Sequence, residues 1–253
     1  KHFEKSVELK PRFADAALAL GDLLISQDRT RDAIQFFAKY QEKNGPDTGV
    51  AEVLAKLYIG VGELEKALGQ YEILEASDSE NLEAKLSIAK IYIDQKAFSK
   101  AIVKLEEILG RAPYSDKIRY YLGAVYEEVK DYKNAITQFL QIPVASSYYE
   151  DSVIHAAYLF KLIDDYPKAI ATVENGIKMK DSYPQFYALY AGFLDDLKEY
   201  DRAHSVLQQA VQKFPKNAQL HFYIGKINKK LGHLDQTEVA MKKVLEIDEN
   251  HVQ

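Results

Sequence analysis

Six alanines recur along this chain at a constant interval of 34 residues: Ala33, Ala67, Ala101, Ala135, Ala169 and Ala203. A fixed interval of this length, kept without insertions, indicates that one structural unit is repeated. Placing each alanine at position 20 of its unit gives repeat starts at 14, 48, 82, 116, 150, 184 and 218. The seventh unit carries Thr237 at this position. The period constrains the fold more strongly than any single motif.

Position 8 of every repeat is also small, and its residues are Gly21, Ala55, Ala89, Gly123, Ala157, Ala191 and Gly225. Large apolar residues occupy positions 7, 11, 17 and 24, which is the spacing of buried helix faces. Two antiparallel helices can approach closely only where side chains are small. The sequence therefore predicts an antiparallel helix pair in each repeat, crossing at positions 8 and 20.

A 34-residue helix-turn-helix unit with Gly or Ala at position 8, Tyr at 11, Ala at 20, Phe or Tyr at 24 and Pro at 32 resembles the tetratricopeptide repeat. Pro11, Pro113 and Pro215 occupy position 32. The resemblance covers nearly all of the chain and implies an all-α, right-handed superhelical solenoid. We expect residues 1–253 to form one domain of seven full repeats, with residues 1–13 as the second helix of a truncated repeat.

Pro143 departs from this pattern, because it stands at position 28, inside the expected second helix of the fourth repeat. Proline cannot continue a helix. This helix is therefore expected to end near Gln141, and residues 144–149 are expected to form a loop that carries Tyr148 and Tyr149. Two interpretations stay open: a local irregularity, or a bend or contact with a functional role.

The formal net charge of −5 argues against a nucleic-acid-binding surface, which needs clustered Lys and Arg to neutralise phosphates. The longest apolar stretch, residues 16–25, is too short to span a bilayer, so no membrane insertion is expected. The chain has no Cys, which leaves both the cytoplasm and an exported location open. The segment around Pro143 weakly resembles long bacterial exported repeat proteins. Because residue 1 is Lys, we expect the sequence to be a piece of a longer protein.

Catalytic and metal-binding signatures are missing from the sequence or occur in the wrong context. Ser87 and Lys90 match a Ser-x-x-Lys motif, but its companion motifs do not follow and both residues fall inside an expected helix. The six histidines are dispersed, with no His-x-x-x-His spacing that would bind a metal ion. We therefore predict a protein that is not an enzyme, with no cofactor and no metal site.

The resemblance implies a concave groove lined by the first helices of the repeats. In chaperone-binding members of the family, Lys and Asn side chains of this groove clamp a terminal carboxylate, but the matching positions here hold other residues. The groove instead offers aromatic side chains, a histidine and a lysine: Tyr120, Tyr121, His155, Tyr158, Phe222, Tyr223 and Lys226. Rings with polar tips suit the binding of a peptide segment. We predict a protein-interaction scaffold; alternatively, these rings pack between adjacent first helices.

Adjacent acidic residues recur near the ends of the first helices, at Glu127 and Glu128, Asp164 and Asp165, and Asp195 and Asp196. Neighbours on a helix do not face each other, so these are not paired carboxylates for acid-base catalysis. We expect them to form a solvated edge. The alternative is a site for basic residues of a partner.

The two ends of a repeat array expose apolar faces unless further structure covers them. We expect Phe3 and Val7 at one end, and Val244 and Leu245 at the other, to be edges for self-association. The alternative function is therefore a structural module that forms homo-oligomers by stacking repeats or exchanging a helix.

Overall fold

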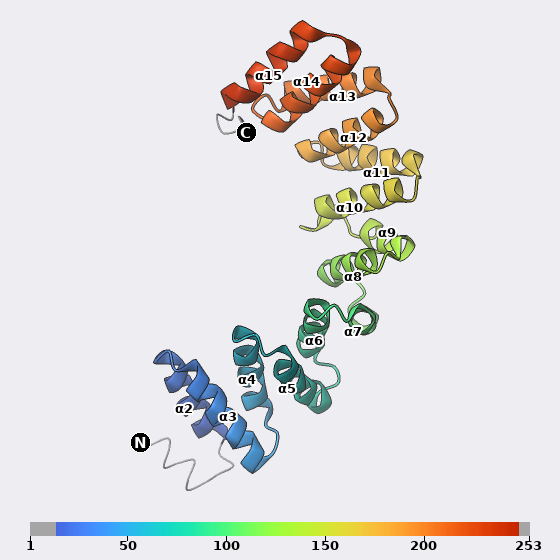
Figure 1. The fold of residues 1–253 in the computed structure, drawn as a ribbon. Helices are drawn as coiled ribbons and strands as arrows, with labels where there is room; N and C mark the ends of the chain where they lie inside the picture. The colour runs from blue at the N-terminus through green and yellow to red at the C-terminus, as the bar shows by residue number, and fades with distance from the viewer. Residues whose placement is uncertain (1–13, 248–253) are drawn as a thin grey trace. The chain divides into compact units, whose positions relative to one another are not determined.

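The structure, a computed structural model, describes residues 14–247 of the chain. Within this range it contains fourteen α-helices and no strand (Figure 1). The expected half repeat at residues 1–13 lies outside the described residues. Contacts between helices divide the chain after Tyr114 into two compact units, called unit 1 and unit 2 below.

Unit 1 holds three helix pairs: α2 Ala14–Ser26 with α3 Thr30–Asn44, α4 Thr48–Gly60 with α5 Leu64–Ser77, and α6 Leu82–Asp94 with α7 Phe98–Arg111. Unit 2 holds four pairs: α8 Asp116–Glu128 with α9 Tyr132–Leu140, α10 Tyr149–Leu162 with α11 Tyr166–Met179, α12 Pro184–Asp196 with α13 Tyr200–Lys213, and α14 Ala218–Leu231 with α15 Leu234–Ile247. Within each unit, every helix packs against the next one along the chain. The first helices begin at the predicted repeat starts, except that α10 begins one residue earlier.

The first helices of several repeats begin at a side-chain cap in position 34 of the preceding repeat. Asp47 accepts a hydrogen bond from the backbone N–H of Val50 at 3.0 Å. Asn81 and Asn217 cap α6 and α14 in the same way. Such caps satisfy N–H groups that have no partner inside the helix, so the short polar residue between repeats fixes where the next repeat starts.

The turn inside each repeat is closed by a residue in the left-handed conformation at position 15. These residues are Asp28, Gly62, Lys96, Lys130, Asp164, Lys198 and Gly232, with φ between 57° and 82°. A side chain in this conformation costs roughly 1–2 kcal/mol, whereas glycine adopts it freely. Five of the seven turns are therefore strained, because the same geometry is imposed on Lys or Asp.

The predicted helix crossings at positions 8 and 20 are confirmed. All six repeated alanines are 0% exposed, and the residue at position 8 is buried in every repeat. Where position 8 is Gly, the side chain at position 24 fills the space: a Cβ on Gly123 would lie 2.8 Å from the Phe139 ring. Thr237, the exception at position 20, is only half-buried.

The end of α9 near Pro143 matches the prediction, because this helix stops at Leu140 and Gln141 follows it as the C-cap. The expected position of Tyr149 in the loop was wrong. Tyr149 begins α10 and is 8% exposed. The ammonium group of Lys180 lies 5.7 Å from its ring centroid, so contacts with the following repeat hold this tyrosine in the helix.

Candidate functional site

The predicted groove residues all lie on first helices of unit 2: Tyr120 and Tyr121 on α8, His155 and Tyr158 on α10, and Phe222, Tyr223 and Lys226 on α14. The structure separates five of them into two groups and places Tyr121 and Phe222 in neither. One group packs between α8 and α10, and the other lines an open groove formed by α10, α12 and α14. We call the second feature the inner groove.

Tyr120 and His155 belong to a packed cluster. The Tyr120 hydroxyl lies 3.4 Å from Nε2 of His155, and Nδ1 of His155 lies 2.7 Å from a carboxylate oxygen of Glu127. The Tyr120 ring also packs against Phe139 and Tyr148, with centroids 5.7 and 5.1 Å away. Burial, with smaller contributions from nearby carboxylates, raises the pKa of Tyr120 above its ordinary value. The phenol therefore stays protonated at neutral pH.

Tyr121 follows Tyr120 on α8, and its side chain is half-buried. It does not line the inner groove. Phe222 is 41% exposed and packs edge-on against Tyr223, with 6.1 Å between the ring centroids. Phe222 therefore extends the aromatic surface of α14 beside the groove.

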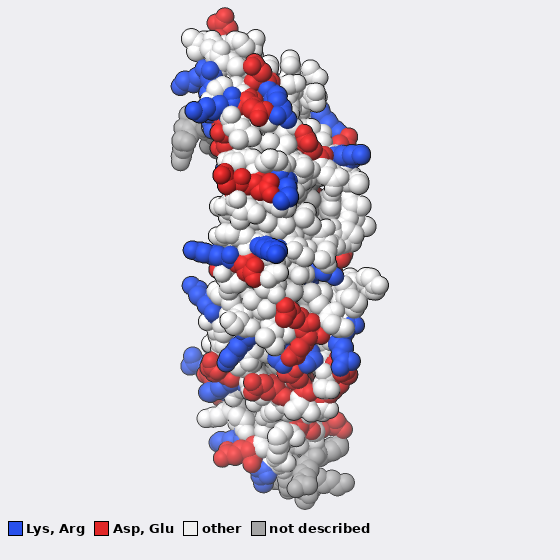
Figure 2. Space-filling model, turned by 90° about the vertical axis from the view of Figure 1, so that its right-hand side faces the viewer, with Lys and Arg blue, Asp and Glu red and all other residues white. Residues whose placement is uncertain are grey.

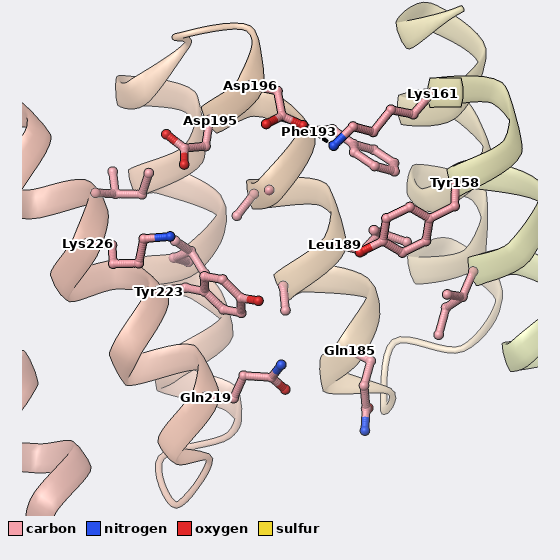
Figure 3. A pocket seen from close by; sticks show the side chains of 16 residues that line it. Tyr158, Lys161, Gln185, Leu189, Phe193, Asp195, Asp196, Gln219, Tyr223 and Lys226 are labelled. Atoms are coloured by element: carbon pink, nitrogen blue, oxygen red, sulfur yellow. Dashed lines mark ion pairs between the residues drawn. The ribbon is translucent and has the colours of Figure 1, made fainter. Parts of the chain in front are cut away.

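The inner groove has a volume of about 320 Å³. Its walls are Tyr158 from α10 and Tyr223 from α14, whose hydroxyl groups point into it (Figure 3). Neither hydroxyl has a hydrogen-bond partner within residues 14–247, and Tyr158 is 48% exposed. The two rings thus offer apolar faces and polar tips to the same space.

The floor of the inner groove is formed by small residues of α12, which sequence reasoning missed. Ala188 and Gly192 stand at positions 5 and 9 of the sixth repeat, and a Cβ built on Gly192 would meet nothing within 4 Å. The flanking repeats carry larger side chains on the same face, so α12 is recessed between them. This contrast between neighbouring repeats was visible in the sequence and was the available signal.

Ion pairs close one end of the inner groove. Asp196 pairs with Lys161 of α10 at 2.6 Å, and Asp195 pairs with Lys230 of α14. These hydrogen bonds raise the pKa of both lysines above the ordinary value. The expectation of a merely solvated edge is therefore corrected for this acidic pair. Because adjacent helix residues diverge, each aspartate reaches a different flanking helix.

Lys226 differs from these lysines, because it forms no ion pair with any residue in 14–247. Its ammonium group lies 5.8 Å from the centroid of the Tyr223 ring. Gln185 and Gln219 lie toward the opposite end of the groove (Figure 3). The inner groove thus combines an apolar floor, two phenols, two amides and one uncompensated positive charge.

The predicted self-association edges are only partly visible. Phe3 and Val7 lie outside the described residues. Val244 is 4% exposed and packs inside the last repeat, which corrects its assignment to an open edge. Leu245 is the next residue along α15. Unlike Val244, it is 46% exposed.

Acidic and basic side chains are interspersed on the face drawn in Figure 2. Residues 14–247 contain no group of three or more His, Asp or Glu side chains that could hold a metal ion. In the same range, no helix is long and apolar enough to cross a membrane.

Models of the tetratricopeptide repeat family match residues 1–47, 53–116 and 218–251, more than half of the chain. The chain belongs to the tetratricopeptide repeat family. This confirms the resemblance found in the sequence and the all-α repeat fold that it implied. A search of curated protein sequences gives no match.

Solved structures of other tetratricopeptide repeat proteins are similar in fold. The C-terminal part of such a protein from Cytophaga hutchinsonii has a TM-score of 0.67 at 14% identity, covering 92% of this chain and 95% of that one. One from Parabacteroides merdae has a TM-score of 0.56 at 16% identity, covering 93% of both chains. A chain in the structure of Naa15/Naa10 bound to HypK has a TM-score of 0.68 at 13% identity, covering 97% of this chain and 40% of that one. At these identities the likeness concerns the fold.

Proposed function

We propose that this tetratricopeptide repeat protein is a non-catalytic scaffold that binds a segment of a protein partner in the inner groove. The observation that supports this is the recessed floor at Gly192, open between the exposed Tyr158 and the facing Tyr223. Ligand sites in proteins are usually concave and lined by apolar and aromatic side chains with a few polar groups, which is the composition of this groove.

The groove chemistry favours a short, mainly apolar segment that carries an acidic group opposite Lys226. Tyrosine buries a large area with few rotamers to lose, and its hydroxyl can exchange hydrogen bonds with the backbone of a bound chain. The volume of about 320 Å³ lies at the lower end of the range of ligand pockets, roughly 300–1,000 Å³. We therefore assign Tyr158, Tyr223 and Lys226 to binding, and Tyr120 and His155 to packing between α8 and α10.

Gly192 gives a direct test. A random peptide library displayed on phage is selected against the wild-type chain, and the recovered peptides are measured against two variants. Gly192→Phe fills the groove and is expected to weaken binding at least tenfold. Gly192→Ala adds only a methyl group where a Cβ would meet nothing within 4 Å, and is expected to weaken binding clearly less than Gly192→Phe does. Peptides that bind Gly192→Phe as tightly as the wild type would contradict the proposal.

The second candidate function is self-assembly through the last repeat, favoured by the 46% exposed Leu245 on α15. Light scattering over a range of concentrations tests it. The wild-type chain is expected to associate as its concentration rises, and the Phe3→Glu, Leu245→Glu double variant is expected to remain monomeric. A wild-type chain that is monomeric throughout would exclude this candidate.

A further inference from the structure

A second groove lies in unit 2, on the side of the second helices. It runs between α13 and α15 with α14 as its floor, and its volume is about 770 Å³. We call it the outer groove. Its lining includes His204 and Val211 of α13, His221 and Asn228 of α14, and Val239 of α15, and it shares no residue with the inner groove.

The equivalent space one repeat earlier, between α11 and α13, is occupied by the chain itself. Tyr187 and Tyr190 stand at positions 4 and 7 of the sixth repeat and are 8% and 9% exposed. The Tyr190 hydroxyl donates to Glu174 of α11 and accepts a hydrogen bond from Arg202 of α13 at 3.2 Å. Two phenols thus fill that gap, and one of them links the two second helices.

The seventh repeat lacks these rings. Positions 4, 7 and 11 hold His221, Ile224 and Asn228, and all three line the outer groove. The Nε2 atom of His221 lies 3.0 Å from the carbonyl oxygen of Pro215, near the end of the sixth repeat. The space that tyrosine rings fill in the sixth repeat is therefore open in the seventh.

Asn228 also leaves a specific polar group without a partner. Its side chain is 3% exposed, and its Oδ1 atom has no hydrogen-bond donor within residues 14–247. A buried acceptor without a donor is costly, and such groups in native proteins call for an explanation. Oδ1 itself has almost no accessible surface, so a ligand in the groove can donate to it only after the Asn228 side chain turns toward the groove; that hydrogen bond would then remove the cost.

The two lysines at the rim are compensated. Lys242 pairs with Glu238 at 2.7 Å, and Lys243 pairs with Glu246 at 2.8 Å. Both glutamates have a pKa below the ordinary value because these lysines donate hydrogen bonds to them. The rim therefore favours an uncharged ligand over a phosphate.

We propose that the outer groove binds a tyrosine side chain of a partner protein, whose phenol hydroxyl donates to Oδ1 of Asn228. The ring would pack against Val211, Ile224 and Val239, covering Val239, which is 68% exposed. The partner thereby supplies in trans the aromatic filling that Tyr187 and Tyr190 supply in cis one repeat earlier.

The test compares p-cresol with toluene, which has the same ring and methyl group but no hydroxyl. Titrations of the isotope-labelled chain are followed by NMR at the Asn228 side-chain amide and the Val239 methyl groups. We expect p-cresol to shift both signals and to bind at least about tenfold more tightly than toluene, because only p-cresol satisfies the buried acceptor. Equal affinity for the two compounds, or shifts confined to other residues, would overturn the proposal.

Further probes identify the source of the phenol. N-acetyl-tyrosinamide is expected to bind at least as tightly as p-cresol, and N-acetyl-phosphotyrosinamide more weakly. If p-cresol binds but N-acetyl-tyrosinamide does not, the groove takes small phenols and a tyrosine partner is excluded. Tighter binding of the phosphorylated compound would also overturn the proposal.

Three variants check the geometry. Asn228→Leu introduces the leucine that the sixth repeat carries at position 11. It is expected to remove the preference for p-cresol over toluene while keeping weak binding of both. His221→Tyr is expected to reduce binding of both compounds by filling the groove in cis. Gly192→Phe changes only the inner groove and should leave p-cresol binding unchanged. The outer-groove proposal can therefore be tested separately from the function proposed for the inner groove. The comparison of compounds on the wild-type chain stands even if a variant fails to fold.

Discussion

The two compact units hold neighbouring repeats together with different side chains. In unit 1, Glu75 of α5 accepts hydrogen bonds from Lys85 of α6 and Lys104 of α7, at 2.6 and 2.7 Å, and Glu107 of α7 contacts both lysines at 3.1 and 3.2 Å. In unit 2, rings do much of this work: Phe139 of α9 lies between Tyr120 and His155, with ring centroids 5.7 and 4.9 Å away.

The grooves described here lie in unit 2, where ion pairs such as Lys161–Asp196 also join neighbouring repeats. Rings pack repeats by filling volume, so a repeat in which a ring is replaced or a helix is shortened leaves space. The inner groove opens at Gly192 and the outer groove at Asn228. A third groove of about 340 Å³ lies beside α11, where α9 stops at Leu140. The three grooves therefore coincide with departures from the repeat pattern.

The largest effect is expected from removing the ring at the centre of the unit 2 cluster. Phe139 is 1% exposed, so Phe139→Ala should lower the free energy of unfolding by about 4 kcal/mol, because it leaves a cavity. Hydrogen exchange should accelerate in α8, α9 and α10. Leu140→Ala, at a neighbouring residue that is 52% exposed, is the control and should cost less than about 1 kcal/mol. Similar losses in the two variants would contradict this picture of unit 2.

A smaller loss is expected in unit 1 when its ionic network is cut. Glu75→Gln leaves Lys85 and Lys104 with one carboxylate between them, and should cost about 2 kcal/mol, the range for hydrogen bonds to charged groups. Hydrogen exchange of α5, α6 and α7 is the measurement. Glu72→Gln, at an exposed position of the same helix, should change nothing. If both variants behave alike, the network does not stabilise unit 1.

The pH dependence of the stability of Glu75→Gln tests whether charge is the cause of this loss. Burial alone would raise the pKa of Glu75, but hydrogen bonds from Lys104 and Lys85 outweigh it and lower the pKa below its ordinary value of 4.5. A carboxylate whose pKa is lower in the folded chain than in the unfolded chain stabilises the fold at pH values above its unfolded-state pKa. This stabilisation is lost as the pH falls through its folded-state pKa. The stability difference between wild type and Glu75→Gln should therefore be constant near neutral pH and shrink below pH 4.5. A difference that persists in acid would show a cause other than charge.

The smallest effect should be the same in both units, because it arises in the turn and not at the interface between repeats. Lys96 in unit 1 and Lys198 in unit 2 have φ values of 57° and 62°. Replacing either by Gly should raise the free energy of unfolding by about 1 kcal/mol, since glycine adopts this conformation without strain. Alanine at the same positions keeps a Cβ and should give no gain. Thermal unfolding of the four variants is the check, and a gain with alanine would rule out strain as the cause.

The sequence by itself determined the helix pairs, their crossings and, except for the one-residue shift of α10, the starts of the first helices. These features follow from local rules: a helix buries residues at regular spacing, only small residues allow two helices to cross closely, and a proline inside a helix, such as Pro143, ends it. The 34-residue alanine period could therefore be interpreted without knowing the spatial neighbours of any residue. The resemblance to the tetratricopeptide repeat family followed from this period.

The tertiary structure decided which of the predicted groove residues share one site. Tyr120 and Tyr158 looked equivalent in the sequence, yet Tyr120 is packed against His155 while Tyr158 faces the open floor at Gly192. The burial of Val244 and the unsatisfied oxygen of Asn228 were equally hidden. The physical reason is that the exposure of a side chain depends on its neighbours. In a groove these neighbours come from three helices, each about a full repeat apart in the sequence. The repeat pattern does not specify which side chains those helices carry.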